Sequence, residues 1–216
     1  MTSEELKKQN MERALQSMYD LCLQHGIDNT TKEMVARASK ISRATVDRYF
    51  INKSEGVIQM AEWLGNKLHT QNRHLETELA SGKHTGAEML IRYMDVVKDL
   101  FYKDPNLFVF VTELKPYIYR NCPETVPAFR RLADVFGHRS ALNKIFLCGI
   151  KDGSLEPDLD PEKETDYLTE FYCGYLSKLA LLPNPTAKEN QPRVDDLIQR
   201  STRHYLIRKE PISTVQ

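Results

Sequence analysis

Apolar residues recur every three or four positions along almost the whole of this 216-residue chain, and no other feature constrains its fold as strongly. The first such stripe contains Met11, Ala14, Leu15, Met18 and Cys22, and it predicts a helix with one buried face. Half-buried strands alternate apolar and polar residues between turn signals. The sequence contains no long segment with this pattern. The sequence therefore predicts an all-α protein of about nine helices.

Capping signals divide the N-terminal part of the chain into a helix followed by two short helices. Gly26 ends the first helix, because glycine accepts the left-handed conformation common at helix C-termini. Thr30 or Thr31 can cap the second helix, and Ser42 can cap a third that runs to Phe50. Two short helices packed on a first helix make a helix-turn-helix unit. The side chains expected to face inward are those of Met34, Val35, Ala38, Val46 and Phe50.

Longer helices follow and form a second, larger domain, so the predicted domains are residues 1–53 and 54–216. Breakers such as Asp104-Pro105 and Pro183 separate these helices. Their predicted ranges are Met89–Phe101, Leu107–Tyr119, Val126–Ile150, Tyr167–Leu182 and Val194–Leu206.

Several protein classes are excluded by composition and spacing. The longest apolar stretches fall far short of the ~20 residues that a membrane span needs, and the charged N-terminus lacks a signal-peptide core. We therefore expect a cytoplasmic protein. Four cysteines and six histidines are scattered without the spacing of a metal site or disulfide framework. With no nucleophile–base pair or phosphate-binding loop in the sequence, we expect neither enzymatic activity nor a cofactor.

Basic residues gather around the third helix, although the chain as a whole has no net charge. Between Thr30 and Lys53, six basic residues stand against two acidic ones. A local excess of this kind suits a polyanionic partner such as DNA. The alternative is a solvated helical face with ordinary surface charges.

The exposed face of the third helix carries side chains that can read base pairs. Arginine can donate to guanine O6 and N7, threonine can contact a base or a thymine methyl, and alanine permits close approach. A helix of this length, about 13 Å, is comparable to the ~12 Å width of the major groove. This face contains Arg43, Ala44, Thr45, Asp47, Arg48 and Tyr49, while Lys32, Tyr49 and Lys53 can reach phosphates.

The stretch from Arg13 to Leu64 resembles the TetR (tetracycline-repressor) family of bacterial transcription regulators. It has a helix, a glycine, "TT", "VARA", "IS", a helix ending in "RYF", then "NK" and another amphipathic helix. Nearer the C-terminus, "GIKDGSLEPDLDPE" is similar to the family's connection into its penultimate helix. The resemblance implies a three-helix DNA-binding domain and a larger helical domain for ligand binding and dimerisation. It also implies a ligand-responsive regulator, most often a repressor, that binds a palindromic operator as a homodimer.

Carried over by position, the resemblance implies three groups of DNA contacts. The start of the second helix meets the backbone, the third helix faces the major groove, and the residues after it grip phosphates. The predicted DNA-binding residues are Thr31, Lys32, Ser42, Arg43, Ala44, Thr45, Asp47, Arg48, Tyr49 and Lys53.

Two residues depart from the family pattern. Lys40 occupies the turn position where the family usually has glycine, so a left-handed lysine is expected there. Asp47 stands where the family usually has a phosphate-binding tyrosine. Its carboxylate could accept from a cytosine amine or pair with Arg43 or another cation, and we favour both roles together. A third reading is a helical protein that acts through protein partners with little sequence-specific DNA binding.

The C-terminal helices and the aromatic residues predict two further sites. The helix Tyr167–Leu182 is apolar on more than one face, which together with Val194–Leu206 predicts a homodimer interface. By resemblance, some aromatic residues should line a cavity for a small, largely apolar effector, although such residues can also be plain core. The predicted ligand-binding residues are Trp63, Tyr93, Phe101, Phe108, Val111, Tyr117, Phe129 and Tyr172.

Overall fold

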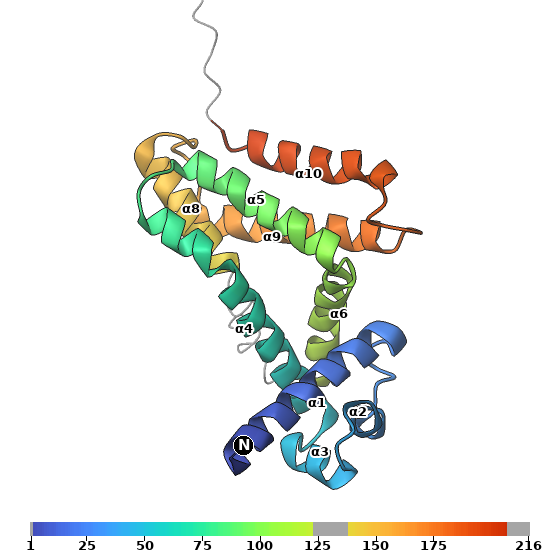
Figure 1. Cartoon of the computed structure of the whole chain (residues 1–216). Coiled ribbons are helices and arrows are strands. Elements are labelled where there is room, and N and C mark those ends of the chain that lie inside the picture. Colours follow the sequence, from blue (N-terminus) through green and yellow to red (C-terminus); the bar gives the residue numbers. More distant parts are fainter. Residues whose placement is uncertain (1, 123–137, 207–216) are drawn as a thin grey trace, which may run out of the picture. The chain divides into compact units, whose positions relative to one another are not determined.

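The computed structural model describes residues 2–122 and 138–206, and within these ranges its regular elements are helical (Figure 1). An isolated bridge pairs Leu155 with Leu206, and no longer strand occurs in the described residues. The all-α prediction is therefore confirmed. The helices are α1 (Ser3–His25), α2 (Lys32–Ser39), α3 (Arg43–Tyr49), α4 (Lys53–Ala80), α5 (Gly86–Lys103), α6 (Asn106–Asn121), α8 (His138–Asp152), α9 (Pro161–Ala180) and α10 (Gln191–Arg203), with a short 3-10 helix, η2 (Lys188–Asn190).

The predicted helix Val126–Ile150 is described only from His138, the start of α8. The part of that prediction before His138, which includes Phe129, lies outside the described residues. No described helix has both the length and the apolar composition required to cross a membrane.

The described chain forms two compact units. Unit 1 contains residues up to 71 together with residues 106–122, and unit 2 contains residues 72–105 and 138–206. The predicted domain boundary after residue 53 falls at the start of α4, whereas the compact units divide α4 after Gln71. Unit 1 also includes α6, because Phe110 packs edge-on against Tyr19 of α1 with ring centroids 5.2 Å apart.

Unit 1 contains the helix-turn-helix. Thr2 and Glu5 form a capping box at the start of α1, and Gly26, with a φ of 79°, ends the helix as predicted. On α2 the buried residues are Val35, Ala36 and Ser39, so the prediction that Ala38 faces inward is wrong. Ser39 can be buried in its place because its hydroxyl donates to the Val35 carbonyl at 2.6 Å.

Unit 2 is built around α5, which buries Met89, Leu90, Tyr93, Met94, Val97 and Phe101. At its N-terminus α5 crosses α8 so closely that a Cβ on Gly86 would lie 2.2 Å from the backbone of Gly149. The end of α8 also caps α5. The Asp152 carboxylate accepts from the Gly86 N–H at 2.7 Å, and the Ser154 hydroxyl accepts from the Ala87 N–H at 3.0 Å.

Candidate nucleic-acid interface

The candidate interface is centred on α3, which the sequence predicted as Ser42–Phe50. The Ser42 hydroxyl accepts from the Thr45 N–H at 3.2 Å and caps α3. The helix ends at Tyr49, and Phe50 after it is extended. Val46 and Phe50 are fully buried in unit 1. Ala44 and Arg48 are exposed. The Arg48 guanidinium donates to the Thr45 hydroxyl at 3.1 Å, which orders the side chain along its own helix.

The turn between α2 and α3 has the predicted left-handed residue. Lys40 has φ 56° and ψ 38°, a conformation that glycine adopts more easily. Its N–H donates to the Arg37 carbonyl, and the Ile41 N–H donates to the Ala36 carbonyl at 3.1 Å. These bonds satisfy carbonyl groups at the end of α2, and the Lys40 side chain is exposed.

Asp47 forms ion pairs with two cations, so its predicted pairing with Arg43 is confirmed. One carboxylate oxygen accepts from the Arg43 Nε at 2.9 Å, and the other lies 2.5 Å from the Lys32 ammonium. Hydrogen bonds from Arg43, first, and from Lys32 hold the pKa of Asp47 below its usual range. Each oxygen of the carboxylate therefore contacts one cation within the protein.

The Lys32 ammonium is also bound at the end of α3. It donates to the carbonyls of Phe50 and Ile51 at 3.1 and 3.3 Å, and its side chain is only 16% exposed. An ammonium has three N–H donors, and these two carbonyls and Asp47 can take all three. The phosphate contact predicted for Lys32 would have to replace one of them.

A second carboxylate completes this arrangement. Glu33 forms an ion pair with the Arg43 guanidinium, which already donates to Asp47. Lys32 and Glu33 come from α2, and Arg43 and Asp47 come from α3. We name these four residues the α2–α3 charge cluster. Its two positive and two negative charges cancel, so it adds no net charge to the surface.

Three other predicted DNA contacts make bonds inside unit 1. Thr31 caps α2 by accepting from the Met34 N–H at 3.2 Å. The Tyr49 hydroxyl donates to the Lys7 carbonyl at 3.4 Å. The Lys53 ammonium donates to the Asp28 carbonyl at 2.5 Å, and it lies 5.8 Å from the centre of the Tyr117 ring.

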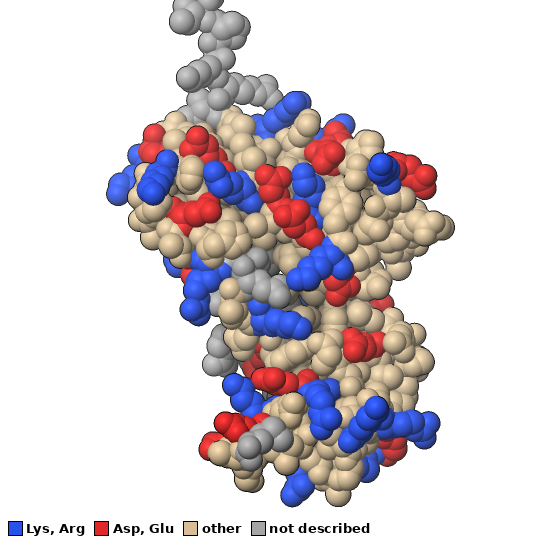
Figure 2. Space-filling model, viewed as in Figure 1, with Lys and Arg blue, Asp and Glu red and all other residues tan. Residues whose placement is uncertain are grey.

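Two exposed cations beside the turn were counted in the sequence but not assigned to the site. Arg37 and Lys40 lie at the end of α2 with exposed side chains. The local excess of basic residues was the signal that could have found them. Figure 2 shows lysine and arginine side chains mixed with acidic ones over the α1–α3 end of unit 1.

The predicted ligand-binding residues fall in both units. Trp63, Phe108, Val111 and Tyr117 belong to unit 1. Tyr93, Phe101 and Tyr172 are buried in unit 2, where the hydroxyls of Tyr93 and Tyr172 lie 3.1 Å apart. Neither unit by itself brings the whole predicted set together.

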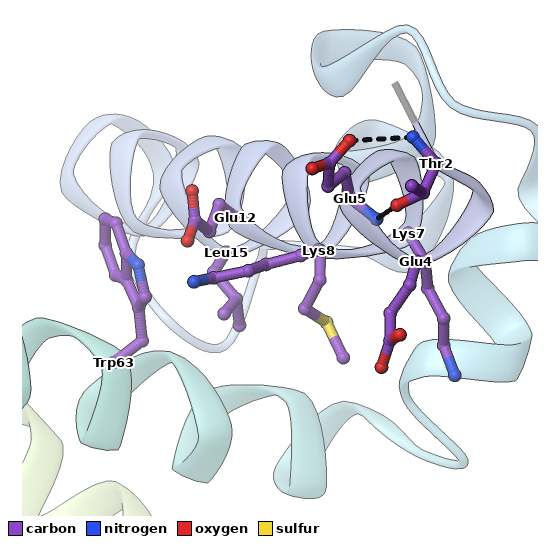
Figure 3. A pocket seen from close by; sticks show the side chains of 9 residues that line it. Thr2, Glu4, Glu5, Lys7, Lys8, Glu12, Leu15 and Trp63 are labelled. Atoms are coloured by element: carbon purple, nitrogen blue, oxygen red, sulfur yellow. Dashed lines mark hydrogen bonds between the residues drawn. The ribbon is translucent and has the colours of Figure 1, made fainter.

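Trp63 lines a groove of about 730 Å³ along α1 (Figure 3). Met11 and Leu15 supply apolar surface beside it, and the Lys67 ammonium lies 4.9 Å from the centre of the Trp63 ring. The surroundings of Trp63 are thus more charged than the sequence predicted for an apolar effector. The charged residues of the groove are Glu4, Glu5, Lys7, Lys8 and Glu12.

The α9 helix has two apolar faces, as its sequence predicted. One face packs into unit 2 through residues that include Leu168, Tyr172 and Leu176. On the other face, Tyr167 is 65% exposed and Phe171 is 51% exposed. These two side chains, with Arg200 of α10 and His204 just after it among others, border a hollow of about 490 Å³.

The ion pairs of Asp47 predict how stability depends on pH. A carboxyl whose pKa is lowered by folding contributes stability above its unfolded pKa of about 3.9, and this contribution is lost as pH falls through the folded pKa. Wild type should therefore be more stable than Asp47→Asn at neutral pH, and the two should converge as the pH falls through the lowered pKa of Asp47. Urea unfolding at a series of pH values measures the gap; a gap that stays constant into acid would contradict the pairing.

No family model matches this sequence, and no curated protein matches it. Solved structures do match. FadR from Bacillus subtilis in complex with stearoyl-CoA has a TM-score of 0.67 at 16% identity, over 90% of this chain and 97% of that one. The reduced form of NemR from E. coli has a TM-score of 0.69 at 14% identity, over 91% and 97%. A TetR transcription regulator from Haloarcula marismortui ATCC 43049 has a TM-score of 0.68 at 18% identity, over 92% and 98%. At these identities the likeness is one of fold.

Proposed function

We propose that this chain, which has the fold of TetR-family transcription regulators, is a ligand-responsive repressor that binds a palindromic operator as a homodimer. The observation that carries the proposal is the surface of α3. Ala44 and Arg48 are exposed beside Thr45, and Arg37 and Lys40 flank them at the end of α2.

This surface fits the major groove in size and chemistry. Seven residues of helix are about 10 Å long, which is within the ~12 Å width of the groove. Arg48 can donate two hydrogen bonds to a guanine, and Ala44 lets the helix approach the bases closely. Arg37 and Lys40, beside the α2–α3 turn, can neutralise phosphates.

Two copies are needed because one short helix contacts only a few base pairs. The exposed apolar face of α9, with Tyr167 and Phe171, supports self-association with the neighbouring surface of α10. A two-fold dimer places its two reading helices on two related half-sites, which is why the operator is proposed to be palindromic.

A small, largely apolar effector is the second part of the proposal. Unit 2 contains buried aromatic side chains, among them Tyr93, Phe101 and Tyr172. The FadR structure was solved with stearoyl-CoA, so long-chain acyl thioesters are the first compounds to test. Release of DNA by such a compound would support this part.

Action through a protein partner is the alternative, and the α2–α3 charge cluster favours it. Two of the basic residues at the reading helix, Lys32 and Arg43, are neutralised by Glu33 and Asp47. Neutralisation reduces the nonspecific attraction to phosphates that DNA-binding proteins use.

The two functions differ in binding to the DNA beside the protein's own coding region. For a regulator, we expect affinity for that DNA at least about 1,000-fold higher than for random duplex at physiological salt. Affinity for both should fall as salt increases, because phosphate contacts release counterions. Fluorescence anisotropy with a random duplex of equal length and composition as control measures this. Equal affinity for both duplexes would contradict the proposal.

A further inference from the structure

We propose that the α2–α3 charge cluster positions α3 and does not read bases, and that Arg48 is the arginine that selects the DNA sequence. This inference rests on the proposed DNA-binding function and assigns different roles to the two arginines of α3. The sequence alone placed both of them on the reading face.

The first argument is the direction in which each side chain leaves the helix. Successive residues of a helix are rotated by about 100°. Arg48 is two residues from Val46, which is fully buried, and is itself exposed, so it points away from the core. Ala44 is two residues before Val46 and shares this outer face. Arg43 and Asp47 instead lie on the flank of α3 where they meet Lys32 and Glu33 of α2.

The two arginines also differ in the ion pairs that each would have to break to bind a base. Bidentate recognition of guanine requires two N–H groups on one edge of the guanidinium. The Arg43 guanidinium donates to Asp47 through Nε and forms an ion pair with Glu33 at Nη1, and its side chain is 38% exposed. Arg48 bonds to Thr45 on its own helix, and within the described residues it forms no ion pair with a carboxylate. Arg48 can therefore present a fork to DNA without breaking an ion pair.

The third argument is the way the cluster joins the two helices. Lys32, at the start of α2, donates to Asp47 and to the carbonyls of Phe50 and Ile51 at the end of α3. Arg43, at the start of α3, pairs with Glu33 of α2. The cluster thus links the beginning and the end of α3 to α2. Loss of one of the four cluster residues should change the angle of α3. The affinity for DNA should then fall by a similar amount at every base position of the motif.

Selection from a library of random DNA duplexes tests this assignment with the full-length protein. Wild type should enrich a motif with two related half-sites. Arg48→Ala should lose the preference at one base pair in each half-site, and its affinity for the wild-type motif should fall about 10- to 100-fold. Asp47→Asn should enrich the same motif as wild type, with lower affinity spread over all its positions.

Two further variants separate positioning from general damage to the fold. Arg43→Lys keeps a cation for the two carboxylates but lacks the planar guanidinium fork. Because Arg43 is proposed to position α3 and not to read bases, this variant should enrich the wild-type motif. The double variant Lys32→Met/Asp47→Asn should lose less affinity for the motif than the sum of the two single losses, because the Lys32–Asp47 ion pair is broken by either change. Thermal unfolding of each variant shows that it is folded before DNA is added.

The results that overturn the inference are equally specific. A changed base preference at one position in Asp47→Asn or Arg43→Lys would show that the cluster reads bases. An unchanged motif in Arg48→Ala would remove Arg48 from that role. If wild type enriches no motif, the proposed function itself fails, and that outcome is distinct from the other two.

Discussion

Gly86→Ala is expected to destabilise unit 2 by about 3 kcal/mol, because the added methyl has no space. A Cβ at this position would lie 2.2 Å from the Gly149 Cα and 2.9 Å from the Ile145 carbonyl oxygen. Both are backbone atoms, so the clash cannot be relieved by rotating a side chain. Separation of α5 from α8 would also weaken the cap that Asp152 places on Gly86. The melting temperature should fall by roughly 6–12 °C if the 216-residue chain unfolds as a whole.

The matched control is Gly174→Ala on α9. A Cβ at Gly174 meets nothing within 4 Å, and alanine in a helix interior is more favourable than glycine by roughly 0.5–1 kcal/mol. Differential scanning calorimetry of wild type and both variants gives the comparison. Equal melting temperatures for the two variants would show that α5 and α8 do not cross as described.

Phe171→Glu is expected to abolish dimerisation at micromolar concentration, and with it operator binding. Phe171 is 51% exposed, beside Tyr167 on the outer face of α9. A carboxylate buried there by dimerisation loses its hydration, and the Arg200 guanidinium that borders the same hollow is already paired with Asp196, so the change should cost several kcal/mol. A loss of about 3 kcal/mol corresponds to a dissociation constant roughly 100-fold higher. A monomer has one reading helix, so its affinity for a two-site operator should fall at least as far.

Ile91→Glu is the control for this prediction, because it adds the same charge to another exposed apolar position of unit 2. Ile91 lies on α5 and is 42% exposed. Sedimentation velocity should show a monomer for Phe171→Glu and a dimer for Ile91→Glu. Dimers of unchanged stability in both variants would place the interface elsewhere.

Features set by neighbouring residues were predictable from the sequence. The end of α1 at Gly26, the left-handed Lys40 and the Ser42 cap depend on bonds to residues a few positions away. The pairing of Arg43 with Asp47 also follows from helical geometry, since residues four apart share a face. Such local rules were enough to predict the fold class and the position of α3.

Features that depend on distant residues were not predictable. Lys32 is a good phosphate ligand by type, but its ammonium bonds to carbonyls 18 and 19 residues later. The carbonyl that binds Lys53 belongs to Asp28, 25 residues earlier. Periodicity cannot indicate these partners, because they depend on how α2, α3 and α4 pack.

The same limit explains the inward-facing residues of α2 and the ligand set. The spacing of Val35 and Ala38 fits one helical stripe, but packing against α1 and α3 buries Ala36 and Ser39. Aromatic residues at helical spacing were assigned to one cavity, yet Phe108 and Tyr93 lie in different compact units. A stripe reveals that a face is buried and leaves open what covers it.

Methylation interference at guanine N7 tests the central claim most directly, because N7 lies in the major groove. Duplexes that carry the motif enriched by the wild-type protein are methylated sparsely, mixed with the protein, and separated into bound and free fractions. Our account predicts that methylated guanines are excluded from the bound fraction in two half-sites whose centres are about one helical turn, or a multiple of it, apart. Equal methylation of bound and free DNA at every guanine would contradict the placement of α3 in the major groove.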